Sequence, residues 1–407
     1  MLLEIKNWKK NFMTIWCGQA VSQFSSSILQ FAIVWYLTDK TKSAMVLSAA
    51  MFMGFLPQAL LGPVVGVFID RYPRKIIMIV SDLFIAGVSL LLVLFNQGGT
   101  IPIWLILIVL GLRSIGTAFH HPSLQAATPQ LVPMEQLTKC AGYSQSLESI
   151  SMILSPAIAA VLYTAWSLQS IILLDVAGAI VAVAALCISV VPSHLSGEPP
   201  IRRKVLQEAK EGFTILRSNK GMMELVMIGA LYTIALMPIS ALFPLMCMSY
   251  FKGTSVEASI AEIVFSVGFL IGSFILAKWG GTKNKIYTIV GSYLLMSAAL
   301  LVSGLLSPNA FPLFAVMAGI MGISGPFYWG MYTPLLQQQF QKEHLGRVIS
   351  LSGSIRLLAG PIGLGLSGLV SERFGVEKWF LVSGVLTILA AILCLTLSNI
   401  RTMDKKN

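Results

Sequence analysis

The sequence predicts an all-α membrane protein with twelve transmembrane helices in two six-helix bundles, and three observations support this prediction. The 407-residue chain is 56% hydrophobic and only 11% charged, whereas an ordinary soluble domain has about 25% charged residues. Apolar stretches of the ~20 residues needed to cross a bilayer core recur along the whole chain. Lys and Arg residues gather in alternate hinges between these stretches. Composition, segment length and charge distribution therefore agree on a multi-pass membrane protein.

Apolar windows bounded by charged residues, or by clusters of Pro and Gly, define the individual helices in order. The predicted helices cover residues 13–37, 44–69, 76–95, 101–126, 138–163, 167–191, 222–250, 256–279, 284–307, 310–339, 346–370 and 376–399.

The positions of the basic residues predict the orientation in the membrane. Of the 28 Lys and Arg residues, 21 fall in the termini and in the hinges of one face, and 5 fall at the opposite face. The remaining two, Arg113 and Arg356, lie inside predicted helices. Because positively charged loops stay in the cytoplasm, we expect both termini to be cytoplasmic. This distribution also explains the net charge of +11 without nucleic acid as a partner, since no basic cluster gathers in one folded domain.

The longest polar interval divides the chain into two halves. Residues 192–221 contain a Pro and Gly cluster, followed by a segment whose apolar side chains fall on one side of a helix. We predict an N-terminal six-helix bundle at residues 1–191, an amphipathic linker helix on the cytoplasmic surface at 192–221, and a C-terminal six-helix bundle at 222–407.

A weak sequence similarity between the two halves supports duplicated bundles. The acidic, Leu and basic residues before the fifth helix have the same spacing as those before the eleventh: Glu135, Leu137 and Lys139 match Glu343, Leu345 and Arg347. Pro156 and Pro361 then fall inside those two helices. Many secondary transporters place their substrate site between two such repeats.

Several kinds of chemistry have no sequence pattern to support them. The chain contains no Gly-Lys dipeptide, so it has no P-loop for ATP. Gly363, Gly365 and Gly368 have the spacing of a dinucleotide-binding loop, but the surrounding apolar helix favours close helix packing. His120 and His121 are adjacent and diverge by about 100° on a helix, so they cannot chelate one metal ion. We therefore expect no enzyme, no metal and no cofactor.

Four charged residues inside predicted helices are candidates for proton coupling: Glu148, Arg113, Asp175 and Arg356. A charge at a helix centre costs about 2.5–3.5 kcal/mol on insertion scales, so each indicates a partner or water. Arg113 and Glu148 both fall near mid-depth on consecutive helices, where they could face each other or a shared cavity. The hypothesis is that Glu148 binds a proton during turnover, because burial favours a neutral carboxyl group and a nearby arginine favours a carboxylate. The alternative is a permanent structural ion pair.

Polar and aromatic side chains indicate a wet, amphipathic cavity. The first helix has a polar stripe of residues within about 100° of one another: Gln19, Ser22, Gln23, Ser26 and Gln30. In the second half, Tyr232, Tyr328 and Tyr332 are candidates for aromatic walls. A large amphipathic substrate suits this combination, and hydrogen bonding between helices or plain packing is the alternative.

The hinge between the second and third helices has the pattern G-x-x-x-D-R-x-x-R-K, formed by Gly66, Asp70, Arg71, Arg74 and Lys75. The glycine allows close helix approach, and the aspartate can reach the positive N-terminal end of a neighbouring helix. These contacts would favour one conformation, which makes the hinge a candidate conformational latch. The alternative is a positively charged loop that serves orientation alone.

These motifs resemble those of the major facilitator superfamily. The hinge matches the superfamily's signature, with Pro73 where a Gly is common, and Arg113 with Gly116 resembles its fourth-helix motif. Ser155-Pro156 and Gly360-Pro361 are similar to the Gly-Pro element of its antiporters. Within the superfamily the chain resembles the macrolide-efflux (Mef) proteins of Gram-positive bacteria, most clearly over residues 7–48, 55–78, 113–160 and 345–366.

The resemblance implies an antiporter that exports macrolide antibiotics by alternating access, with the proton as coupling ion. We expect it in the lipid bilayer of a bacterial cell membrane, functional as a monomer, with an amphipathic small molecule as substrate. One alternative is an exporter of another amphipathic compound, such as another drug, a siderophore or a lysophospholipid. The other is a membrane scaffold or sensor that transports nothing.

Overall fold

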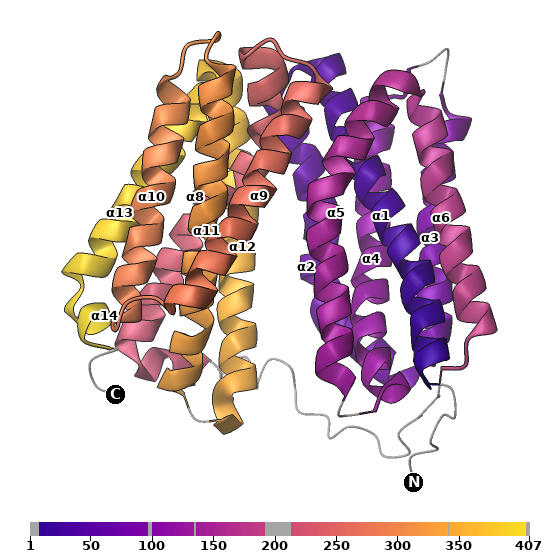
Figure 1. Ribbon diagram of the computed structural model, residues 1–407, viewed down its shortest axis with the longest axis horizontal. Helices are drawn as coiled ribbons and strands as arrows, with labels where there is room; N and C mark the ends of the chain where they lie inside the picture. The colour runs from indigo at the N-terminus through magenta and orange to yellow at the C-terminus, as the bar shows by residue number, and fades with distance from the viewer. Residues whose placement is uncertain (1–7, 97–99, 134–135, 192–212, 341, 404–407) are drawn as a thin grey trace. The chain divides into compact units, whose positions relative to one another are not determined.

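A computed structural model describes residues 8–96, 100–133, 136–191, 213–340 and 342–403 of the chain. Within these ranges the chain folds into long helices joined by short turns (Figure 1). The helices divide into two compact units. Unit 1 comprises Met1–Leu37 and Ala50–Ile201, and unit 2 comprises Thr38–Ala49 and Arg202–Asn407.

The helices follow one another without intervening strands in the described ranges. The first six are α1 (Trp8–Thr41), α2 (Ala44–Arg71), α3 (Arg74–Leu94), α4 (Ile103–Leu131), α5 (Leu137–Ala165) and α6 (Leu168–Ile188). The later ones are α8 (Lys220–Leu245) with a π-helical turn at Met246–Tyr250, α9 (Ser255–Trp279), α10 (Lys285–Leu305), α11 (Phe311–Gln339), α12 (Lys342–Phe374), α13 (Val376–Thr396) and α14 (Ser398–Met403).

Each predicted apolar segment corresponds to one of these helices, with ends that differ by a few residues. In the described parts of the chain, ten helices are long and apolar enough to cross a membrane, so the prediction of an all-helical multi-pass protein is confirmed. The count of twelve spans and the cytoplasmic location of the termini stay predictions. Pro156 and Pro361 lie inside α5 and α12, as expected. Most of the predicted linker helix, residues 192–212, lies outside the described residues, and residues 213–218 are helical.

Short polar side chains begin several helices because the first backbone N–H groups of a helix have no partner within it. The Asn219 side chain accepts a hydrogen bond from the backbone at the start of α8, and Asn284 does the same for α10. At α9, Thr254 and Glu257 form a capping box, which satisfies two such donors reciprocally. These residues set the turns between the long apolar helices.

In unit 1, α3 lies between α4 and α6 and packs against both. A buried cluster joins Phe12 of α1, Met78 of α3, Ala127 of α4 and Leu186 of α6 near one end of these four helices. Their apolar contacts fix which helix faces meet. The polar residues of the candidate site lie further along the same helices.

In unit 2, glycines allow α9 and α11 to approach until their backbones touch. A Cβ atom added at Gly268 of α9 would overlap the carbonyl oxygen of Gly319, and one at Gly322 of α11 would overlap that of Phe265. Gly272 lies one turn beyond Gly268 and meets the α11 backbone in the same way. Small residues at such interfaces are typical of helix association in membranes, where packing replaces the hydrophobic effect.

We expect Gly322→Ala to destabilise unit 2, because the added methyl group must displace backbone rather than a flexible side chain. The cost of such overpacking is about 1–3 kcal/mol. Gly291→Ala on α10 is the matched control, since a Cβ there meets nothing within 4 Å. Thermal unfolding of the purified protein in detergent measures both variants, and an equal melting temperature for the two would contradict the close-packing interpretation.

Candidate functional site

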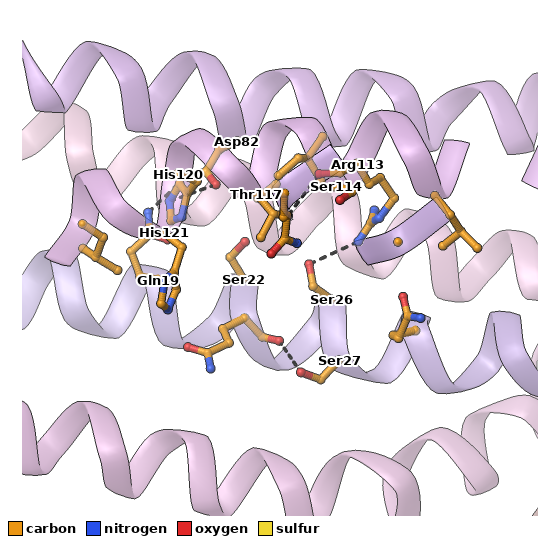
Figure 2. Close-up of a pocket in the computed structure, with 18 of the residues that line it drawn as sticks. Gln19, Ser22, Ser26, Ser27, Asp82, Arg113, Ser114, Thr117, His120 and His121 are labelled. Carbon is orange, nitrogen blue, oxygen red and sulfur yellow. Dashed lines mark hydrogen bonds and ion pairs between the residues drawn. The ribbon is translucent and has the colours of Figure 1, made fainter. Parts of the chain in front are cut away.

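A cavity of about 460 Å³ lies within unit 1, and many of the side chains in its wall are polar. Five helices of the unit contribute to it: α1, α2, α3, α4 and α6. Figure 2 shows polar side chains of α1 on one side of this cavity, facing Asp82 of α3 and residues of α4. Besides the α1 stripe, the polar side chains in the wall are Ser27, Gln58, Asp82, Arg113, Ser114, Thr117, His120 and His121.

All five residues of the predicted polar stripe on α1 line this one cavity: Gln19, Ser22, Gln23, Ser26 and Gln30. Gln19 and Ser22 are buried in its wall, whereas Gln23 and Gln30 are exposed. Apolar side chains such as Phe31 and Leu110 complete the wall. Neutral amides beside apolar surface make the cavity amphipathic, and its filling with water and a role in holding a substrate stay predictions.

Arg113 of α4 forms a buried ion pair with Asp175 of α6. Its Nη1 atom lies 2.6 Å from Asp175 Oδ2, and the side chains of the two residues are 12% and 2% exposed. Ser26 of α1 donates to the other carboxylate oxygen of Asp175 at 2.6 Å, and Arg113 also donates to Ser89 of α3. A buried ion pair is favourable only when such hydrogen bonds satisfy its remaining polar atoms. Four helices thus meet around one compensated charge.

This pairing differs from the expected facing of Arg113 and Glu148. Glu148 lies on α5, its side chain is exposed, and it is not among the residues that line the cavity. Arg113 and Asp175 come together because α3 packs against both α4 and α6. The sequence placed Arg113 and Glu148 at one depth but could not indicate which helix would lie beside α4. Proton binding by Glu148 remains a hypothesis.

A second polar cluster surrounds Asp82 of α3, which is 4% exposed. Gln19 of α1 donates its amide hydrogen to Asp82 Oδ2 at 3.1 Å. His120 Nε2 of α4 lies 3.3 Å from Asp82 Oδ1, a distance that makes an ion pair when the imidazole is protonated. On the sequence alone, His120 shares a polar helix face with Arg113 and Thr117, and it cannot chelate a metal ion together with His121. The signal that points to the pair is an acid and a base at matching depths on two neighbouring helices.

Arg356 of α12 has a different environment, in unit 2. Its guanidinium carbon lies 4.8 Å from the ring centre of Trp329 and 4.2 Å from that of Tyr332, and it donates to the Tyr328 hydroxyl at 3.3 Å. Tyr232 packs on Tyr328 with ring centres 5.0 Å apart. The three tyrosines proposed as cavity walls are therefore buried against one another and Arg356. Stacking on aromatic faces stabilises a guanidinium that is removed from water.

The hinge residues that can be described bind backbone carbonyl groups of α6 and α4 inside unit 1. Lys75 Nζ donates to the carbonyl oxygens of Ser189 at 2.8 Å and Cys187 at 3.2 Å, at the end of α6. Arg74 donates to the carbonyl oxygen of Ala126 in α4. Cations at helix C-termini satisfy carbonyl groups that lack a partner. The side chains of Asp70 and Arg71 and the surroundings of Gly66 lie outside the described residues, so the latch stays a prediction.

Comparison with known proteins adds an independent observation. Residues 15–252 and 225–406 match the sequence profile of the Major Facilitator Superfamily. The chain is 51% identical over 403 residues to macrolide efflux protein A of Streptococcus pyogenes, which covers 99% of this chain and 100% of that protein. A protein of the same name from Enterococcus faecalis is 49% identical over 322 residues, covering 79% of this chain and 99% of the relative.

The fold is also similar to that of solved transporters. A crystal structure of a mutant of the nucleoside transporter NupG aligns with a TM-score of 0.76 at 13% identity. The alignment covers 95% of this chain and 98% of the other. At that identity the likeness concerns the fold alone.

We expect the loss of either the Arg113 or the Asp175 charge to destabilise the protein more than the loss of both. Arg113→Gln or Asp175→Asn alone leaves an uncompensated buried charge, which costs about 3–5 kcal/mol of stability. The double variant removes both charges, so its melting temperature in detergent should recover toward that of the unchanged protein. Losses that simply add in the double variant would show that the two side chains do not depend on each other.

Proposed function

The chain belongs to the major facilitator superfamily, and from this premise we propose that it exports macrolide antibiotics in exchange for protons. It is a multi-pass membrane transporter and not an enzyme. In the proposed cycle the two bundles alternate in exposing a substrate site to the two faces of a bacterial cell membrane. The protein works as a monomer, with both termini in the cytoplasm and the proton as coupling ion.

The observation that carries the proposed substrate is the similarity to macrolide efflux protein A. It extends over 99% of this chain at 51% identity, so it includes every helix that lines the unit 1 cavity. The cavity wall supports the proposal chemically, because ligand sites of this kind combine apolar surface with a few placed polar groups. Gln19, Gln23 and Gln30 supply neutral hydrogen-bonding groups for the oxygen-rich face of an amphipathic substrate.

The proposed coupling needs a side chain that binds a proton in one conformation and releases it in another. The charged residues in the spanning helices supply the candidates: Glu148 of α5, Arg356 of α12, the Arg113–Asp175 pair and, from the structure, the Asp82–His120 pair. Arginine keeps its proton in proteins, so Arg113 and Arg356 act on the coupling through their fixed charge. The carboxyl and imidazole groups are the ones able to exchange a proton.

Export of another amphipathic compound is the alternative within the same class. The cavity's neutral amides do not by themselves select a macrolide. A susceptibility panel in a pump-deficient bacterial host, with macrolides, other drugs, siderophores and lysophospholipids, separates the two. Protection only against compounds that are not macrolides would favour the alternative. Protection against none of the compounds would favour a membrane scaffold or sensor.

We expect cells that express the protein to accumulate severalfold less radiolabelled erythromycin than cells with an empty vector. Adding a protonophore should raise accumulation to the empty-vector level, because it removes the proton gradient that drives export. The empty-vector cells, treated in the same way, control for effects of the protonophore on the membrane. Low accumulation that persists after the gradient has collapsed would overturn proton-driven export.

A further inference from the structure

We propose that Asp82 and His120 form the proton-carrying pair of the transport cycle. We further propose that the proton-free pair attracts a cationic group of the substrate, such as a protonated amine. The inference rests on the proposed function, because it assigns residues to the coupling step of that same transporter. Its basis is a repeated arrangement of polar residues in unit 1, together with the chemical difference between the two copies.

The polar residues of unit 1 form two layers. The first layer consists of Asp82, Gln19 and His120, and the last two each contact Asp82. The second consists of Ser26, Ser89 and Arg113, joined by hydrogen bonds and by the ion pair to Asp175. On each of α1, α3 and α4 the two layers are seven residues apart, which is close to two helical turns or about 10.5 Å.

The seven-residue spacing agrees with the contacts within each layer. It puts both layers on the same face of each helix. Along the chain the layers follow in one order on α1 and α3 and in the reverse order on α4, as antiparallel packing of α4 against α3 requires. Asp82 therefore meets His120 for the same geometric reason that Ser89 meets Arg113. The first layer forms part of the cavity wall, because Asp82 and His120 both line the cavity (Figure 2).

The two layers differ in whether their charge can change. Asp175 is bound to a guanidinium, which keeps its proton at every physiological pH, so the second layer stays neutral overall. Asp82 instead accepts a hydrogen bond from a neutral amide and lies 3.3 Å from an imidazole nitrogen. Imidazole is the side chain that most readily gains or loses a proton near neutral pH. The first layer thus carries a charge of −1 when His120 is neutral and 0 when it is protonated.

The remaining ionisable groups around the pair leave this difference intact. His121 and Arg113 line the same cavity, and Asp175 contacts Arg113 behind its wall. Gln19 of α1 and Gln58 of α2 contribute neutral amides. His121 can carry a positive charge of its own, but the imidazole in contact with Asp82 is that of His120, whose Nε2 lies 3.3 Å away.

The dependence of the first layer's charge on the His120 proton couples that proton to the substrate. When His120 takes up a proton from the outer solution, its positive charge compensates Asp82 and the attraction for a cationic substrate group falls, so the substrate leaves. When the proton passes from His120 to the cytoplasm, Asp82 regains its uncompensated charge and binds the next substrate. One proton enters for each cationic group that leaves, and no other reactant is required.

Two variants that fix the charge of the layer in opposite ways test the proposal. His120→Gln keeps a donor for Asp82 but cannot take up the proton, so the layer stays at −1. Asp82→Asn removes the charge, so the layer cannot become negative. The probe is radiolabelled erythromycin, which carries a basic amine, bound to the full-length protein in lipid nanodiscs at several pH values where that amine stays protonated. Proton release on binding is followed with a pH indicator in weak buffer.

We expect the unchanged protein to lose affinity as the pH falls and to release close to one proton for each erythromycin bound. His120→Gln should bind with little dependence on pH and release no proton. Asp82→Asn should bind at least about thirtyfold more weakly at every pH, as expected for the loss of one partner of a buried charge pair. Glu377→Gln is the matched control, because it removes a partly buried carboxylate of α13 in unit 2 and should keep the unchanged protein's pH dependence.

The outcomes separate this inference from the proposed function. If the unchanged protein neither binds nor exports any macrolide, the proposed substrate is wrong. If it binds erythromycin with proton release, and His120→Gln does so equally, the proposed function stands and the assignment to Asp82 and His120 is overturned. Loss of proton release in Glu148→Gln with retention in His120→Gln would also overturn it. Melting temperatures close to that of the unchanged protein establish that the variants are folded.

Discussion

The positive charge of Arg113 is the constraint around which unit 1 is organised. A guanidinium in a membrane-spanning helix must be compensated, since an unpaired charge there is costly and arginine cannot lose its proton. Asp175 of α6 compensates it, and Ser26 of α1 and Ser89 of α3 complete the hydrogen bonds. These contacts fix the rotation of four helices about their axes, and the α1 stripe consequently faces the cavity. The polar cavity is thus a consequence of how one buried charge is satisfied.

The same helix geometry places a second acid and base two turns away, but with a weaker base. In the Arg113 layer the charges are permanent, so the layer holds the helices together without responding to pH. In the Asp82 layer the imidazole of His120 takes the place of the guanidinium, and a conditional ion pair replaces a fixed one. Stability and responsiveness are then properties of separate layers. A transporter needs both, because the scaffold must persist while the charge of the site changes.

Helix positions could be predicted from the sequence, because a helix that crosses a membrane requires a long apolar run of residues, and such runs are visible in the local composition. The α1 stripe could be predicted for a similar reason, since Gln19, Gln23 and Gln30 lie on one face of one helix. The partner of Arg113 could not, because depth follows from residue spacing but the identity of the neighbouring helix does not. Glu148 lies on the next helix in the chain, whereas α3 brings Asp175 of α6 beside Arg113.

Unit 2 holds its own internal cation, the half-buried Arg356, by different means. Arg356 lies over the rings of Trp329 and Tyr332 and bonds the Tyr328 hydroxyl, and none of its described contacts is with a carboxylate. Aromatic faces attract a cation without neutralising it, so this cluster retains a positive charge at every physiological pH. A proton can change the charge of the Asp82 layer in unit 1 but not that of the Arg356 cluster. The two halves, built from similar helices, therefore hold their internal cations differently: Arg113 of unit 1 is paired with a carboxylate, and Arg356 of unit 2 lies on aromatic rings.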